Sequence, residues 1–319
     1  MTALATRLGG LPWRDLAPPT LLLGLVVLVE LFAPGFVTRD TLLMVVADTA
    51  VLFLLATAET FVILLGGIDL SIQAVASFAS VVVAQLLPSI GPLAYLVAVG
   101  TGTLFGIASG VVHVRLRVPS FVATLATGGV VAGLALLASR GRAITIEEGG
   151  RAYTGWLNGT LAGVPSVVIL SVAVGLAGFV VLRYTRFGRF SVAVGAGEPA
   201  AWAAGVNVDR TKITAFAASG TLAALAGAVL AARLSSGSPN LANQLMLPAI
   251  AAVIVGGTAI TGGLGNVGRT AVGALIISIV RIGMTFVGVN IFAENIVFGA
   301  MLIAAVAVTI DRSKIAIIK

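Results

Sequence analysis

The chain contains no cysteine and a single histidine, His113. Without cysteine there are no disulfides, no thiolate nucleophiles and no thiolate metal sites. A lone histidine without a nearby carboxylate or cysteine cluster is a poor metal or proton-relay site and severely limits general-base catalysis, so we interpret His113 as an interfacial residue at a span end. No Ser/His/Asp or paired-carboxylate constellation is present. We therefore expect no catalytic residue, no metal site and no enzymatic activity.

Charged and aromatic residues are also scarce, at 10% and 6% of the chain, whereas 59% is hydrophobic and 39 of the 319 residues are glycine. The mean hydropathy of +1.12 is that of a membrane protein, and glycine is commoner in transmembrane helices than in soluble ones. The apolar runs show no period-2 alternation. The sequence thus predicts an all-α, polytopic membrane protein. The net charge of +7 lies mainly between apolar runs, where it orients spans, so it does not indicate a nucleic-acid partner.

About ten apolar runs predict transmembrane helices. They cover residues 20–36, 42–66, 68–88, 91–113, 119–139, 164–183, 213–233, 246–261, 270–289 and 293–310. With the N-terminus inside, nearly all basic clusters fall on the cytoplasmic side, as the positive-inside rule requires. This predicts a cytoplasmic segment (1–19), a transmembrane domain (20–310) with an external loop (140–163) and a cytoplasmic loop (184–212), and a cytoplasmic tail (311–319). The exceptions are Arg140, Arg142 and Arg151, in the external loop.

Two of the apolar runs are interrupted at matching places. VILLGGIDLS, from Val62 to Ser71, and AVIVGGTAIT, from Ala252 to Thr261, each contain a glycine pair followed by a hydrophobe and a hydroxyl. This match predicts a weak parallel internal repeat, and corresponding glycine-interrupted spans are typical of a transport pathway. The glycines that follow, in GGLGNVGRT, lack the Lys-Ser/Thr of a phosphate-binding loop. We therefore expect any ATP to be bound and hydrolysed by a separate polypeptide.

Small residues recur four positions apart in the span at 213–233. The pairs are Gly220 with Ala224, Ala223 with Gly227, and Gly227 with Ala231. Such faces allow two helices to approach closely in lipid. The spacing leaves open whether the partner helix lies in the same chain or in a second copy.

Four charged residues fall within apolar runs, where each is costly and therefore a functional candidate. They are Asp48, Glu59, Asp69 and Arg281. Asp48 and Glu59 are on one face of a helix and can line a hydrophilic passage; alternatively, Glu59 pairs with Arg281 across helices and serves packing. Asp69 either serves the broken helix or caps the following one. Our candidate pathway or gate residues are Asp48, Glu59, Gly66, Gly67, Asp69, Ser71 and Gln73.

The longest basic, partly polar interruption runs from Arg183 to Lys212. Pro199 suits the first turn of a helix and Gly205 suits its C-terminal cap, so Glu198 to Ala204 is predicted to be a short helix. At about 10 Å it is too short to span a membrane. We interpret it as an interfacial element offered to a cytoplasmic partner.

In four pieces the chain resembles the inner-membrane permeases of ATP-binding-cassette importers for ribose and other monosaccharides. The pieces are TFVILLGGIDLS (60–71), VPSFVATLATGGVVAGLALL (118–137), RFGR with GEPAAWAAGVNVDRTK (186–212), and AIAAVIVGGTAITGGLGNVGRT (249–270). The resemblance implies a non-catalytic, multi-pass permease of the bacterial cytoplasmic membrane that acts with a second permease copy or a homologous permease, cytoplasmic ATPase subunits and a periplasmic or lipid-anchored solute-binding protein. Its cargo would be a ribose-like monosaccharide or related polyol, and no cofactor is expected, because ATP is bound by the separate subunit.

By the same resemblance, the short helix would be the coupling helix that docks on the ATPase. The residues expected to couple are Glu198, Pro199, Ala200, Ala201, Trp202, Gly205 and Asn207. The chain departs from the family pattern at Met246, Pro248, Arg269 and Phe298. Alternatives from related machinery are import of branched-chain amino acids, nucleosides or furanosyl signalling molecules. From another class, an ion-coupled secondary transporter would also use broken helices and midplane carboxylates.

Overall fold

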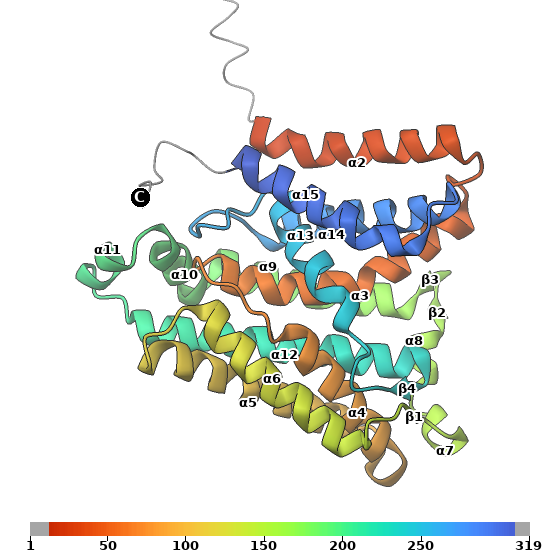
Figure 1. The fold of residues 1–319 in the computed structure, drawn as a ribbon, viewed down its shortest axis with the longest axis horizontal. Coiled ribbons are helices and arrows are strands. Elements are labelled where there is room, and N and C mark those ends of the chain that lie inside the picture. Colours follow the sequence, from red (N-terminus) through yellow and green to blue (C-terminus); the bar gives the residue numbers. More distant parts are fainter. Residues whose placement is uncertain (1–12, 310–319) are drawn as a thin grey trace, which may run out of the picture.

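The computed structural model describes residues 13–309, which are almost entirely helical (Figure 1). The longer helices are α2 (Trp13–Phe32), α3 (Arg39–Ile63), α4 (Ile72–Ile90), α5 (Leu93–Arg115), α6 (Ser120–Ser139), α9 (Ser166–Tyr184), α10 (Arg186–Ala196), α12 (Val208–Leu234), α13 (Met246–Val255), α14 (Val267–Phe286) and α15 (Glu294–Thr309). Short helices are α7 (Glu148–Arg151), α8 (Gly155–Asn158) and α11 (Glu198–Ala203), with the 3-10 turns η1 (Asn243–Leu245) and η2 (Ile291–Ala293). The all-α prediction is confirmed.

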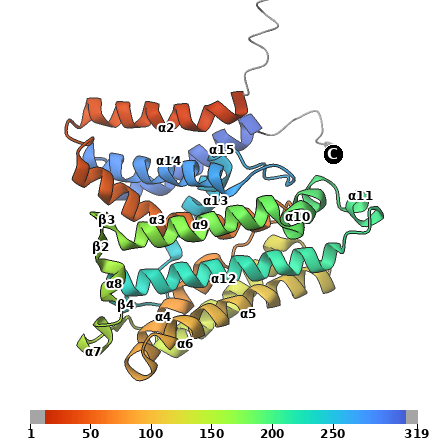
Figure 2. The same ribbon diagram turned by 180° about the vertical axis from the view of Figure 1, so that it is seen from behind.

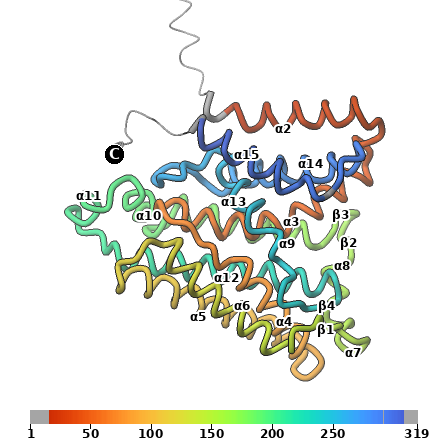
Figure 3. The backbone as a smooth tube through the Cα atoms, in the orientation of Figure 1, coloured from red at the N-terminus to blue at the C-terminus, as the bar shows by residue number. Residues whose placement is uncertain are grey.

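Two short antiparallel ladders lie at one end of the helical bundle, opposite α11 (Figure 1). Strand β1 (Ile144–Thr145) pairs with β4 (Ser236–Gly237), and β2 (Thr160–Leu161) pairs with β3 (Val164–Pro165). We call this the ladder end and the opposite one the α11 end. Helix α2 begins toward the α11 end, and helix α15 ends toward it (Figure 3).

Among the described residues, seven helices are long and apolar enough to cross a membrane: α3, α4, α5, α6, α9, α12 and α14. Three shorter apolar stretches, Leu16–Phe32, Asn243–Val255 and Glu294–Ala307, coincide with the remaining predicted spans. The count of about ten spans therefore stays a prediction. Residues 1–12 of the predicted cytoplasmic segment, residue 310 at the end of the predicted transmembrane domain and the predicted cytoplasmic tail (311–319) lie outside the described part of the chain.

Helix boundaries differ from the predicted ones by several residues at several places, among them the first helix and both interrupted segments. The first helix begins at Trp13 rather than residue 20, with Pro18 and Pro19 inside it. The second predicted span, 42–66, ends early because α3 stops at Ile63 before the Gly66–Gly67 pair. The predicted span 246–261 likewise stops at Val255, before Gly256 and Gly257. Both interrupted segments are thus non-helical at their glycine pairs, where hydropathy alone continued the spans.

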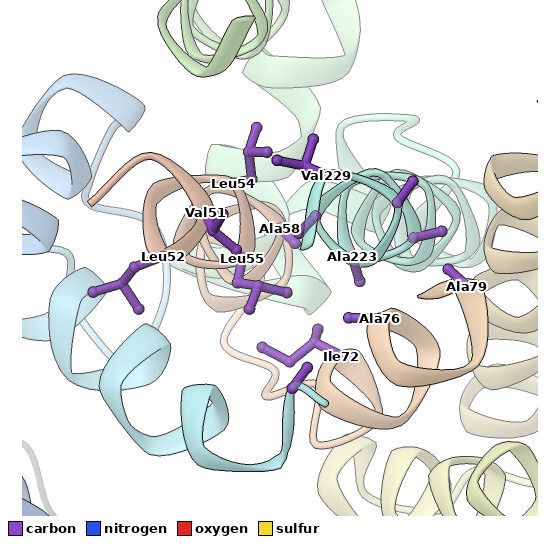
Figure 4. Packing of buried hydrophobic residues seen from close by; sticks show 14 of the residues in the cluster. Val51, Leu52, Leu54, Leu55, Ala58, Ile72, Ala76, Ala79, Ala223 and Val229 are labelled. Carbon is purple, nitrogen blue, oxygen red and sulfur yellow. The ribbon is translucent and has the colours of Figure 1, made fainter. Parts of the chain in front are cut away.

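Helix α12 packs against α5, α4 and α3, and Figure 2 shows it running alongside α5. The buried core is assembled from α3, α4 and α12, with small residues such as Ala76 and Ala223 beside larger ones such as Leu55 and Ile72 (Figure 4). The small-residue face of α12 is used within this chain. A methyl group on Gly220 would lie 2.2 Å from the Gly102 carbonyl oxygen of α5, and one on Gly227 would lie 1.9 Å from the Ala76 carbonyl oxygen of α4. The backbones touch because no side chain separates them.

The interruption from Arg183 to Lys212 contains a helix that the sequence interpretation missed. Helix α10 begins after Thr185, whose hydroxyl accepts a hydrogen bond from Gly188 N at 3.4 Å. Threonine is a favoured N-cap residue, so Thr185 was the available signal. α10 packs against the end of α9 and leads directly to the predicted short helix, α11.

Candidate transport pathway and docking segment

The non-helical stretch between α3 and α4 is held by hydroxyl side chains of α6. Ile68 N donates to Ser120 Oγ, and Leu70 N donates to Thr124 Oγ1, each at 3.0 Å. These bonds satisfy backbone groups that a helix would otherwise pair, which is what permits irregular backbone inside a membrane protein. Sequence reasoning missed Ser120 and Thr124, although their four-residue spacing at the start of a span places them on one helix face.

Asp69 is buried in this break and joins three groups. Its Oδ1 accepts from Ser71 N at 2.9 Å and from Ser71 Oγ at 2.5 Å, and its Oδ2 accepts from Ser219 Oγ of α12 at 2.7 Å. The N-cap position of α4 is Ser71, so Asp69 closes the turn that leads into α4 rather than capping it. Ser219, 150 residues away, carried no sequence signal beyond being a hydroxyl within an apolar run.

Glu59 lies next to Asp69 and is completely buried. Its Oε2 accepts a long hydrogen bond, 3.5 Å, from Asp69 N, while Oε1 has no hydrogen-bond partner. A buried polar atom without a partner is costly and is rare in folded proteins. The structure therefore brings three of the predicted pathway residues, Glu59, Asp69 and Ser71, into one buried polar cluster. We call these three residues and Ser219 the carboxyl cluster.

Asp48 lies elsewhere. Eleven residues, about 16 Å of helix, separate it from Glu59, and its Oδ2 pairs with Arg281 Nη2 of α14. The cross-helix pair expected for Arg281 thus exists, but with Asp48 in place of Glu59. Both members are partly buried, which reduces screening by water. Gln73, also a predicted pathway residue, is partly buried in the first turn of α4.

We expect the Asp48–Arg281 pair to tie α3 to α14 measurably. In a double-mutant cycle of Asp48→Asn, Arg281→Gln and the combined variant, the coupling energy should be about 0.5–1 kcal/mol, because the pair is only partly removed from solvent. Unfolding of the purified protein in detergent measures it. The charge-exchanged variant, Asp48→Arg with Arg281→Asp, serves as the control and should recover part of the loss. A coupling energy of zero would contradict the pairing.

Three glycine-rich segments meet at the α11 end of α3. Gly263 N donates to the Leu64 carbonyl oxygen at 2.9 Å, which joins the two interrupted segments. A methyl group on Gly195, near the end of α10, would lie 1.9 Å from Leu64 O and 2.5 Å from Gly263 N. Gly66 has φ +77°, a conformation that glycine adopts without strain. We call Leu64–Gly66, Gly195 and Gly262–Gly263 the glycine junction.

Helix α11 (Glu198–Ala203) agrees closely with the predicted short helix. Pro199 and Ala200 are in its first turn, Gly205 follows it with φ +83°, and Asn207 caps α12 by accepting from Arg210 N at 2.9 Å. Trp202 is 74% exposed, whereas Ala201 is 4% exposed and packs with Val194, Val206 and Leu65. The helix thus presents an aromatic side chain outward while its inner face rests on α10 and on the residues after α3.

A cavity of about 260 Å³ lies between the helix break and Glu198, the first residue of α11. It is lined by Gly66 and Gly67 on one side and by Glu198 and Lys212, which form an ion pair at 2.5 Å, on the other. His113 also lines it; its Nδ1 lies 2.6 Å from the Val118 carbonyl oxygen, and since a carbonyl only accepts, Nδ1 carries the proton. The predicted docking residue Glu198 and the predicted pathway glycines are therefore neighbours.

Comparison with known proteins places this arrangement in a family. Residues 41–306 match the family described as "Branched-chain amino acid transport system / permease component". The chain belongs to this permease family. The matched region contains both interrupted segments, the carboxyl cluster, α10 and α11.

Individual relatives are similar to the permease over most of their length. The chain is 37% identical to the "Probable ABC transporter permease protein YphD" of Escherichia coli, and the match covers 88% of this chain and 85% of the relative. It is 36% identical to the ribose import permease RbsC of Bacillus subtilis, covering 91% and 90%. It is 34% identical to the L-arabinose ABC transporter permease AraH of Azospirillum brasilense, covering 87% and 82%.

Proposed function

We propose that the permease carries a monosaccharide across the bacterial cytoplasmic membrane as the membrane subunit of an ATP-driven importer. The observation that carries this proposal is the similarity, over about nine tenths of the chain, to permeases named for ribose, with similar coverage of one named for L-arabinose. Those names favour a pentose-like sugar over the branched-chain amino acids, nucleosides and furanosyl molecules that also fit the machinery. A separate ATPase and a solute-binding protein complete the importer.

The α11 end faces the cytoplasm in this proposal. It carries the basic residues Arg183, Arg186, Arg189, Arg210 and Lys212, and the helices that lead from the N-terminal and to the C-terminal segments reach the same end (Figure 1). This supports the orientation through the positive-inside rule. The ladder end, with Arg140, Arg142 and Arg151, would face outside. Acidic residues such as Glu147 and Glu148 contribute little to that rule, so they do not offset the three arginines at this end.

Coupling between the ATPase and the pathway would run through the glycine junction. α11 would seat on the ATPase, and α10 would transmit its displacement because Gly195 contacts both Leu64 and Gly263 directly. Those two residues lie at the breaks after α3 and after α13. Side-chain hydroxyls hold the backbone of the first break, and backbone bonds outside any helix hold that of the second. Movement at α11 would thus reach both breaks and the carboxyl cluster without an intervening flexible side chain.

Uptake measured in membrane vesicles tests the function. The permease is combined with its ATPase and solute-binding partners, and entry of radiolabelled ribose and L-arabinose is followed. We expect uptake that requires ATP and persists when the proton gradient is collapsed. Uptake that follows the proton gradient and ignores ATP would identify a secondary transporter instead.

Trp202→Glu is expected to uncouple the complex. A charge buried in an ATPase groove without a partner is costly, so permease-stimulated ATP turnover should fall about tenfold or more, which corresponds to about 1.4 kcal/mol. Because Trp202 is 74% exposed in the isolated chain, membrane insertion and thermal stability should not change. Ala201 is unsuitable for this test, because a charge there would enter the packed inner face of α11.

Trp156→Glu is the matched control for this test. Trp156 is 54% exposed and lies on α8 at the ladder end. Its substitution should therefore leave ATP turnover unchanged when the permease–ATPase complex is measured without the solute-binding protein. Equal turnover of the Trp202 and Trp156 variants would remove α11 from the coupling role.

A further inference from the structure

A second cavity contains none of the predicted pathway residues and no residue of α11. It has a volume of about 410 Å³ and lies where α9 ends, α10 begins and the chain enters α14. Two arginines, Arg183 from the last turn of α9 and Arg189 from α10, line it together with Gly265 and Asn266. The rest of its wall is mostly apolar: Leu64, Phe179, Leu182 and Val192.

Within residues 13–309, no carboxylate forms an ion pair with Arg183 or Arg189. Arg189 Nη1 makes one long hydrogen bond, 3.5 Å, to the Tyr184 carbonyl oxygen. Two arginines brought to one hollow repel each other, and their forked donors match the geometry of a phosphate group. The cavity is therefore complementary to an anion that carries several oxygen acceptors.

The helix that supplies Arg183 has an exposed apolar face suited to an acyl chain. On α9, Val180 and Leu176 are exposed about one and two turns before Arg183, and Tyr184 beside it is 68% exposed. An exposed apolar helix face that ends in tyrosine and arginine is the pattern of a membrane–water interface. A ligand with a phosphate head and an apolar body would contact all of these groups at once, whereas a free phosphate would use only the arginines.

We propose that this cavity binds the headgroup of an anionic phospholipid from the cytoplasmic leaflet, with Arg183 and Arg189 contacting its phosphate. Basic hollows between helices on the cytoplasmic side are suited to such headgroups. The leaflet assignment rests on the proposed orientation, but the binding itself does not require transport. The lipid would bridge α9, α10 and the start of α14. It would also contact Leu64, which belongs to the glycine junction.

Lipid titration of the purified full-length permease tests this site. The protein in neutral detergent is titrated with phosphatidylglycerol, with phosphatidylcholine or with inorganic phosphate, and the melting temperature and the lipid retained in native mass spectrometry are recorded. We expect a saturable stabilisation by phosphatidylglycerol and little from the other two. Arg183→Gln with Arg189→Gln should weaken the apparent affinity about tenfold or more.

Two further variants keep the test decisive. Arg186→Gln removes a neighbouring basic residue that does not line the cavity, and should bind phosphatidylglycerol like the unmodified protein. Arg183→Lys with Arg189→Lys keeps the charge but not the forked donors, so it should bind phosphatidylglycerol more tightly than the Gln variant and more weakly than the unmodified protein. It replaces the Gln variant as the test if the Gln variant folds poorly. An equal loss in the Arg186 variant, equal stabilisation by phosphate alone, or a double Gln variant that keeps its lipid would each overturn the proposal. These outcomes leave the transport proposal untouched, because no readout depends on sugar or ATP.

Discussion

Gly195→Ala is expected to abolish uptake and to lower the melting temperature of the permease, although alanine is normally the better helix former. The added methyl group would lie 1.9 Å from Leu64 O and 2.5 Å from Gly263 N, both backbone atoms that cannot rotate away. Alanine gains about 1 kcal/mol in helix propensity, and overpacking costs about 1–3 kcal/mol or more. The cost of the steric overlap therefore exceeds the gain in helix propensity, and the overlap forces α10 away from the two breaks. Vesicle uptake and thermal unfolding in detergent measure the two effects.

Gly197→Ala is the matched control for Gly195. It lies two residues later, has φ 170°, and nothing lies within 4 Å of the position that a methyl group would occupy. Uptake and stability of this variant should be close to those of the unmodified protein. If Gly195→Ala transports normally, the glycine junction does not link α10 to the breaks as proposed.

Asp69→Ala is expected to cost about 2–4 kcal/mol of unfolding free energy and to stop uptake. The substitution removes the acceptor for Ser71 N, Ser71 Oγ and Ser219 Oγ, all buried. Each unsatisfied buried donor costs about 1–3 kcal/mol, but the two hydroxyls can turn to nearby helix carbonyl groups, which keeps the total below the sum. Denaturant unfolding in mixed micelles measures the cost.

Ser219→Ala and Asp69→Asn separate the parts of this effect. Ser219→Ala removes one donor together with its bond and should cost about 1 kcal/mol. Asp69→Asn keeps one carbonyl acceptor, so its cost should lie between those of the other two variants. If Asp69→Ala is as stable as Ser219→Ala, the carboxyl cluster does not hold the break between α3 and α4.

Local signals in the sequence predicted the helices, the two interruptions and α11. Pro199 and Gly205 act on the backbone around them, so a helix of the right length follows from chemistry that needs no tertiary partner. Hydropathy likewise located every long helix except α10, but it continued two spans through their glycine pairs, because a run of apolar residues does not reveal where the helix bonds stop.

Contacts between distant segments were beyond the sequence. Arg281 pairs with Asp48 rather than Glu59, a choice made by how α3 and α14 are rotated against each other. Asp69 meets Ser219 across 150 residues, and Gly195 meets Leu64 only because α10 folds back beside α3. Periodicity indicates that a face is polar or small, but it does not indicate which other face will meet it. The partner of the small-residue face on α12 stayed open for the same reason.

The β1–β4 ladder restricts how the ladder end can move. Ile144 and Thr145 pair with Gly237 and Ser236, and Asn158 Nδ2 donates to the Ala232 carbonyl oxygen at 3.1 Å. These bonds join the ends of α6 and α12 and the segment before α9 into one unit, which we call the plate. If the ladder end faces outside as proposed, a route for sugar on that side would open by tilting this plate as a unit, since separate displacement of one loop would break the β1–β4 pairing or the Asn158 bond. A solute-binding protein pressing on the plate would then push several helices at once.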